Sequence, residues 1–251
     1  MMKLHNSKIW CNRFFLQECG FSLVELVIVV FISGAIISIM VSVMPVLLQS
    51  AKSKETRALL VEADTALQGY LAAGGRCPCP DTSANGNENR NDGGTPADFG
   101  DDTCVAYAGD LPWVTLGLSA AEDAWHNQIR YAVDEGLVQT AAAGFCDRII
   151  DAVTSTAVTH ATEPGDTGRL YVTSSVTAAD LSVNMAYVMF SGGAGDADGI
   201  NGFYDGRNGA VPALEFESAE KIIDADYDDI VLGRSCVYLY GRNCAGSSWR
   251  P

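Results

Sequence analysis

Histidine and basic side chains are scarce in this sequence. Of its 251 residues, three are His and 16 are Lys or Arg, against 31 Asp or Glu, and the formal net charge is −15. Nonspecific nucleic-acid binding depends on clustered Lys and Arg, so we expect no nucleic-acid partner. Neither a G-x-S-x-G nor an H-E-x-x-H motif occurs. We therefore expect that the chain is not an enzyme.

Ionisable residues are absent from Leu26 to Leu48. A helix needs roughly 20 apolar residues to cross a bilayer, so this run predicts a single membrane span. Lys3, Lys8 and Arg13 precede the span. The tendency of basic residues to stay in the cytoplasm places the N-terminal segment there and the remainder of the chain outside.

The residues before the apolar run form a distinctive processing signal. A short polar, basic leader ends at Gly20, Phe21 follows, and Glu25 is the one charge at the start of the segment that begins with Phe21. An ordinary secretory signal is cut after its apolar region, whereas here the cut would precede it. The arrangement resembles the class III signal of type IV prepilins and type II secretion pseudopilins. The resemblance implies that a membrane-bound prepilin peptidase cleaves after Gly20 and methylates the new amine of Phe21.

The same resemblance assigns Glu25 to assembly. A carboxylate within a membrane segment is costly and usually has a partner. Processing creates a charged amine at Phe21, which is close to Glu25 on the same helix and also available to the Glu25 of a neighbouring subunit. In type IV pilins the equivalent glutamate is thought to neutralise that amine, and we expect the same of Glu25. The alternative is an interfacial glutamate that faces lipid headgroups.

The helix is predicted to continue beyond the membrane. Apolar residues recur with helical spacing from Leu60 to Leu71, and Gly74-Gly75 is a stop signal. We therefore expect four segments: a cleaved leader (1–20), the transmembrane half of a spine helix (21–48), its amphipathic half (49–73) and a periplasmic globular domain (74–251).

Short β-favouring segments in the last of these predict a sheet. The candidate strands are Arg169–Thr173, Met185–Phe190, Ile230–Leu232 and Cys236–Tyr240. Combined with the resemblance, they imply an α+β, pilin-like fold in which the long N-terminal helix packs on a small antiparallel β-sheet with long loops.

One internal segment resembles the D-P-W-G-N-P-Y-x-Y sequence of the major pseudopilin of type II secretion. Asp123, Trp125, Asn127 and Tyr131 match it, whereas other residues stand at the two proline positions, at the glycine and at the first tyrosine. The departures weaken an assignment to the major subunit.

Six cysteines follow the leader, an even number that fits disulfides in an oxidising compartment. They are Cys77, Cys79, Cys104, Cys146, Cys236 and Cys244. Cys236 with Cys244 would close a terminal hairpin or loop. Cys79 with Cys104 would close the polar loop between them, which leaves Cys77 with Cys146. The alternative is a zinc site, which C-x-C without clustered histidines matches poorly.

A glycine-rich acidic segment follows the predicted strand Met185–Phe190. It contains Asp196, Asp198, Asn201 and Asp205, whose oxygens are the ligand type that Ca²⁺ prefers. The location resembles the calcium-binding loop near the end of major pseudopilins, although Ile200 breaks the EF-hand pattern. Ca²⁺ is therefore the candidate cofactor; the alternative is a solvated, turn-rich acidic loop that binds none.

Together with these features, the resemblance implies a pseudopilin or minor pilin. We expect a single-pass protein of the bacterial inner membrane, with a cytoplasmic leader and a periplasmic C-terminal domain, that is extracted into a type II secretion pseudopilus or a type IV pilus. Its partners would be the prepilin peptidase and other pilins or pseudopilins, contacted through residues 21–48. Two alternatives remain: a minor tip subunit that binds a partner through its loops, and a membrane-tethered periplasmic binding domain that does not polymerise.

Overall fold

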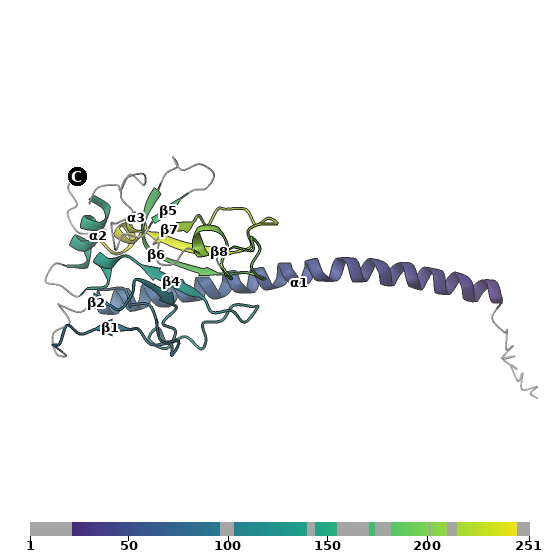
Figure 1. The fold of residues 1–251 in the computed structure, drawn as a ribbon, viewed down its shortest axis with the longest axis horizontal. Coiled ribbons are helices and arrows are strands. Elements are labelled where there is room, and N and C mark those ends of the chain that lie inside the picture. Colours follow the sequence, from purple (N-terminus) through teal and green to yellow (C-terminus); the bar gives the residue numbers. More distant parts are fainter. Residues whose placement is uncertain are drawn as a thin grey trace, which may run out of the picture. The chain divides into compact units, whose positions relative to one another are not determined.

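The chain is α+β in the residues that the computed structural model describes, which are 22–95, 103–139, 144–154, 171–173, 182–200, 202–209 and 215–244. It divides into two compact units, Met1–Leu47 and Leu48–Pro251. A long N-terminal helix, α1, begins in the first unit and ends in the second (Figure 1). In the second unit this helix contacts an antiparallel sheet of four strands.

Helix α1 spans Leu23–Gly74, and Pro45 does not end it. In the first unit every described side chain of the helix is exposed. Among the described residues, α1 is the one helix long and apolar enough to cross a membrane. The hydroxyls of Ser33 and Ser42 donate to backbone carbonyls of the preceding turn. The helix therefore satisfies these polar groups internally, as a lipid environment requires.

The second half of α1 is amphipathic, as its sequence predicts. Leu60, Ala63, Leu67 and Leu71 are each 1–2% exposed and belong to the main hydrophobic core. Their spacing of three or four residues places them on one face of the helix. The predicted stop is also confirmed: α1 ends at Gly74, and the next residue takes a left-handed φ of 63°, which glycine adopts at little cost.

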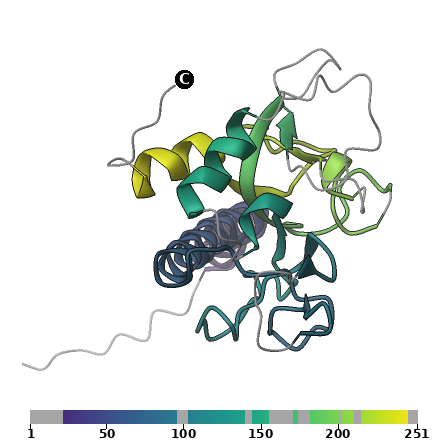
Figure 2. The same ribbon diagram turned by 90° about the vertical axis from the view of Figure 1, so that its left-hand side faces the viewer.

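The sheet consists of β3 (Ala108–Asp110), β4 (Arg130–Val133), β6 (Ser182–Ser191) and β8 (Ile230–Ser235), paired antiparallel in the order β3-β4-β6-β8. The first residues of β6 pair with β5 (Tyr171–Thr173), which runs parallel to β7 (Glu215–Glu217). A separate two-stranded antiparallel sheet is formed by β1 (Arg90–Asn91) and β2 (Thr103–Cys104). Figure 2 shows the second half of α1 end-on beside this sheet. The predicted strand Met185–Phe190 lies within β6, and its side chains are buried on both faces.

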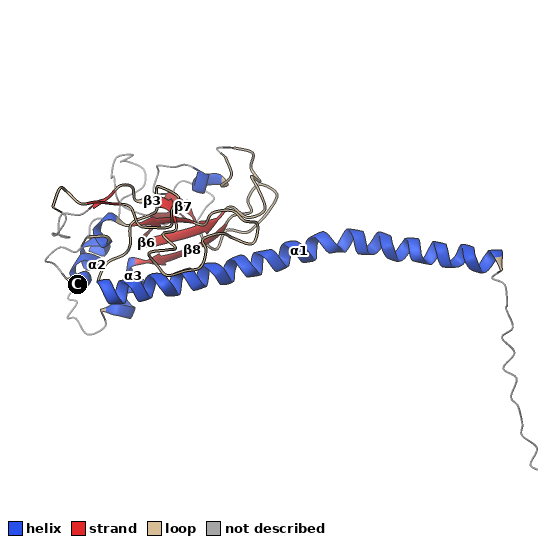
Figure 3. Ribbon diagram, turned by 90° about the horizontal axis from the view of Figure 1, so that it is seen from below, coloured by secondary structure: helices blue, strands red, loops and turns tan. Residues whose placement is uncertain are grey.

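The described part of the second unit also contains two short α-helices, α2 (Phe145–Thr154) and α3 (Cys236–Asn243), and two 3-10 helices, η1 (Glu135–Leu137) and η2 (Gly206–Gly209). Figure 3 shows α2 and α3 near the end of α1. The prediction of a strand at Cys236–Tyr240 is wrong, because these residues form α3. Ser235 caps the helix: its hydroxyl accepts a hydrogen bond from the backbone N–H of Tyr238, and this satisfies a donor that the first turn leaves open.

A buried charge network ties α1 to the sheet. The Asp64 carboxylate, which is 4% exposed, accepts hydrogen bonds from Arg234 at 2.6 Å, the Tyr187 hydroxyl at 2.7 Å and Gln68 at 2.9 Å. Burial alone would raise the pKa of Asp64, but these three hydrogen bonds and the Arg234 charge lower it below its usual value. Asp64 is therefore ionised and fully paired at neutral pH.

Replacing Asp64 by alanine should destabilise the fold by about 2–3 kcal/mol, because Arg234 and Tyr187 lose their common partner. The measurement is thermal unfolding of the detergent-solubilised chain. Glu62→Ala, two residues earlier and exposed, is the matched control and should change little. Since the pKa of Asp64 is lowered in the folded state, its contribution exists above the unfolded pKa of about 4 and is lost as the pH falls through the folded value. An Asp64→Ala defect as large at pH 2 as at pH 7 would contradict this account.

Candidate functional site

Carboxylates from two loops meet near the end of β6. Asp205 lies at the centre, because it belongs to two groups whose ligand atoms all lie within 4.8 Å of one another. One group adds Asp196 and Asp198 from the loop that follows β6; the other adds Asp228 and Asp229, which directly precede β8. Asp205 is fully buried and Asp229 is 3% exposed.

Backbone donors hold Asp205 in place. Its carboxylate accepts from the N–H groups of Ala197 at 2.8 Å, Asp198 at 3.1 Å and Asp228 at 2.7 Å. Gly193, with a φ of 60°, lets the first loop approach the second, since a Cβ there would collide with the Asp228 carbonyl. The two loops are therefore fixed against each other through Asp205.

One carboxylate oxygen of Asp229 has no hydrogen-bond partner among the described residues. Its Oδ2 accepts from the Asp205 backbone at 3.1 Å and from the Asn208 side chain at 2.8 Å. Its Oδ1 and the Oδ1 of Asp228 are buried without a hydrogen-bond partner among the described residues. A buried unsatisfied carboxylate oxygen is costly. Carboxylate oxygens are the hard ligands that Ca²⁺ prefers.

Burial and the repulsion between neighbouring carboxylates raise the pKa of two aspartates in this cluster. Burial raises the pKa of Asp229 to about 8, and the charges of Asp205 and Asp228 add to the effect. The pKa of Asp228 rises to about 6, with burial as the main cause and Asp205 contributing. A bound cation would reverse both effects, because it favours the ionised carboxylates. The buried aspartates can thus hold a metal such as Ca²⁺.

The structure brings together three of the four residues that the sequence proposed as calcium ligands: Asp196, Asp198 and Asp205. Asn201 lies outside the described residues. Asp196 and Asp198 also accept hydrogen bonds from the backbone of their own loop. Sequence reasoning left Asp228 and Asp229 out of the ligand set; the available signal was a pair of acidic residues immediately before an apolar strand.

The segment that resembles the major pseudopilin forms a rigid turn. Asp123 is buried, and its Oδ1 accepts from the backbone of Trp125 at 2.8 Å and of Asn127 at 2.9 Å. The amide of Asn127 donates to the Gly193 carbonyl at 3.2 Å. Matching residues of the segment therefore organise the turn and link it to the loop that carries the carboxylate cluster.

The residues predicted to act in processing and assembly lie near the N-terminus of the sequence. Gly20 and Phe21 are outside the described residues. Glu25 occupies the first turn of α1, where a carboxylate suits the positive end of the helix dipole. Its side chain is exposed, and it is available to a partner from another molecule.

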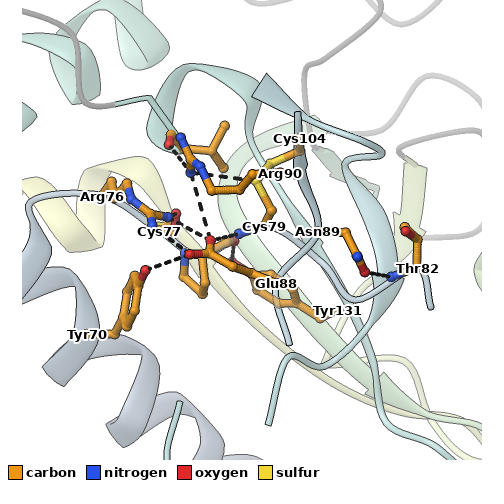
Figure 4. The surroundings of a disulfide bond; sticks show 12 residues. Tyr70, Arg76, Cys77, Cys79, Thr82, Glu88, Asn89, Arg90, Cys104 and Tyr131 are labelled. Carbon is orange, nitrogen blue, oxygen red and sulfur yellow. Dashed lines mark hydrogen bonds and ion pairs between the residues drawn. A yellow bond between two sulfur atoms is a disulfide. The ribbon is translucent and has the colours of Figure 1, made fainter. Parts of the chain in front are cut away.

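Two disulfides occur in the part of the chain that the structure describes. Cys79–Cys104, the predicted loop closure, is confirmed. Figure 4 shows Glu88 near this disulfide. The Glu88 carboxylate forms an ion pair with the Arg76 guanidinium at 2.6 Å. Glu88 also accepts from the Cys79 backbone at 3.0 Å, so an ion pair supports the crosslinked loop.

The other predicted pairings are wrong. Cys146 of α2 bonds to Cys244 at the end of α3, rather than Cys77 to Cys146 or Cys236 to Cys244. The physical reason is that residues 236–243 form a helix that packs on α2, so the expected terminal hairpin does not exist. Cys77 and Cys236 are buried and outside both disulfides. Burial raises the pKa of the Cys77 thiol to about 12, which makes it unreactive while the fold is intact.

No protein-family model, curated protein or solved structure matches the chain. The architecture itself is pilin-like: a long N-terminal apolar helix whose second half packs against a small antiparallel sheet. A helix able to span a membrane and the two disulfides fit a single-pass membrane protein with an extracytoplasmic domain.

Proposed function

We propose that this chain is a prepilin-like filament subunit, a pseudopilin or minor pilin. It is cleaved after Gly20, methylated at Phe21 and held in the bacterial inner membrane. From there it assembles into a type II secretion pseudopilus or a type IV pilus. The observation that carries the proposal is α1 itself: one helix whose first half exposes its apolar side chains and whose second half is built into a globular domain.

The exposed half of α1 requires an apolar environment. From Leu26 to Leu47 it carries no ionisable side chain, and its described residues are exposed around the whole helix. In the membrane, lipid covers this surface. After extraction, only packing against equivalent helices of other subunits would cover it, and a helix that is apolar all round is suited to such a buried position. The proposed partners are therefore other pilins or pseudopilins, contacted through residues 21–48.

The globular unit supports the same function without implying a reaction. Its crosslinked loop and carboxylate cluster suit a folded domain in the periplasm, where disulfides persist and divalent cations are accessible. Ca²⁺ binding at Asp205, Asp228 and Asp229 would fix the loops that precede β8. We assign the cation a structural role and no catalytic one.

The test of processing is the N-terminal sequence and intact mass of the protein purified from native membranes. The expected chain begins with N-methylated Phe21. Gly20→Leu should block cleavage, because the peptidase would lose the small residue before the cut, whereas the control Cys19→Ser should be processed normally. A wild-type chain that retains Met1–Gly20, or is cut elsewhere, would overturn the proposal and favour a tethered periplasmic binding domain that does not polymerise.

A further inference from the structure

Trp125 is attached to the part of α1 that directly follows the apolar run. The centre of its ring lies 5.8 Å from Nζ of Lys52. The backbone N–H of the preceding residue, Ala124, donates to the Thr56 hydroxyl at 3.2 Å. Trp125 is partly buried against the core and partly exposed. These contacts fix the indole at the level of residues 52–56 of the helix.

The turn that presents Trp125 is preorganised. Asp123 binds the backbone of the turn through Oδ1 and accepts from the Ser191 hydroxyl at 2.6 Å through Oδ2. His126 takes a left-handed φ of 68°, and its side chain is 86% exposed. The structure therefore holds an indole and an exposed imidazole at a defined place without needing a partner to order them.

The rise of the helix per residue sets the distance of Lys52 and the Trp125 indole from the hydrocarbon core of the membrane. The apolar run ends at Leu48, and four further residues at about 1.5 Å each put the Lys52 backbone about 6 Å beyond it. The headgroup layer of a bilayer is about 5–8 Å thick on each side of the hydrocarbon core. Lys52 and the indole of Trp125 therefore coincide with that layer, where tryptophan side chains are enriched.

The local charge is opposite to that of the chain. Lys52, Lys54 and Arg57 follow the apolar run, and Glu55 is the one acidic residue from 49 to 61, in a chain with a net charge of −15. The turn contributes Glu122, whose carboxylate lies 3.4 Å from Nδ1 of His126. Long basic side chains next to a membrane span attract anionic lipid headgroups and can bend back toward them.

We propose that Lys52, Trp125 and His126, the Lys52–Trp125 surface, lie in the lipid headgroup layer and bind anionic phospholipid, and that Lys54, one helix position beyond Ser53, adds positive charge at the same level. The surface holds the base of the globular unit on the membrane before the subunit is extracted. This inference rests on the membrane insertion in the proposed function, but it requires neither processing nor filament assembly. A second copy of the chain is the competing occupant, and the test separates the two.

The test uses tryptophan fluorescence of the full chain reconstituted in vesicles that carry a nitroxide quencher on the headgroup. One set contains phosphatidylethanolamine with phosphatidylglycerol, and the other contains phosphatidylcholine alone. The comparison is made in a Trp10→Phe background, because Trp10 of the leader also lies next to the membrane in the proposed topology. In this background the otherwise wild-type chain is compared with Trp125→Phe and with the matched control Trp113→Phe, whose indole packs against Gly86. Flotation of the vesicles measures insertion separately.

We expect the quenched component to disappear in Trp125→Phe and to persist in Trp113→Phe. Its quenching should be at least twofold greater in the anionic vesicles, and a Lys52→Gln, Lys54→Gln double variant should bring that ratio close to one. Equal quenching in the otherwise wild-type chain and in Trp125→Phe would overturn the proposal. So would an indole that is unquenched in vesicles but becomes shielded from aqueous iodide only in filaments, which would identify a second copy as the occupant. A chain that does not float with the vesicles would refute insertion itself.

Discussion

Glu25→Leu should abolish filament assembly while leaving membrane insertion and cleavage intact. In the proposed filament, Glu25 of one subunit neutralises the N-terminal amine of Phe21 in its neighbour. Without Glu25 that amine remains charged in an apolar interior, at a cost of about 3 kcal/mol for each interface. Such a cost lowers association about 100-fold. The measurement is the amount of filament sheared from cells, compared with the amount of subunit in membranes.

Glu55→Leu is the matched control, because it makes the same change at an exposed position of the same helix outside the apolar run. We expect this variant to assemble. Glu25→Asp keeps the carboxylate but shortens the side chain by one methylene group. Partial assembly of this variant would indicate that the negative charge at position 25 is what assembly requires. Normal filaments from Glu25→Leu would show that Glu25 is an interfacial residue that faces headgroups, and that the pairing with Phe21 is wrong.

Features set by local sequence were predictable from the chain alone. The continuity of α1 followed from helical spacing up to Leu71, and its end followed from Gly74-Gly75. The buried strand within Met185–Phe190 followed from a short run that is apolar on both faces. Each of these depends on neighbours within a few residues, and so the pattern is visible before any tertiary contact forms.

Features set by tertiary packing were not predictable in the same way. The β-favouring residues of Cys236–Tyr240 predicted a strand, but the Ser235 cap and packing on α2 make them helical. That one error also produced the wrong partner for Cys244, because a helix directs its cysteines differently from a hairpin. Asp228 and Asp229 join the carboxylate cluster only because β8 returns beside β6, and no spacing rule connects them to Asp205.

Asp229→Asn should have opposite effects on the cation-free and calcium-bound protein. Without a cation, burial and the nearby charges of Asp205 and Asp228 raise the pKa of Asp229, because they make its ionised form unfavourable. A raised folded pKa means that stability is greatest below the unfolded pKa of about 4 and is lost as the pH rises through about 8. The asparagine amide keeps the contacts of Oδ2 and donates to a neighbouring carboxylate. The variant should therefore be about 1–2 kcal/mol more stable than wild type at pH 8 in chelator.

With calcium the order should reverse. Wild type at 100 times its dissociation constant gains about 2.7 kcal/mol, whereas the variant lacks the ligand oxygen and should gain almost nothing. The response of wild type should also weaken from pH 8 to pH 6, because protons compete with the cation for Asp228 and Asp229.

Differential scanning calorimetry with calcium or chelator measures all of these effects. Asp226→Asn, an exposed acidic residue of the same loop, is the control and should respond like wild type. A wild-type melting temperature unmoved by calcium at pH 8 would leave the cluster without a cation role, and an equal response in Asp229→Asn would place the ion elsewhere.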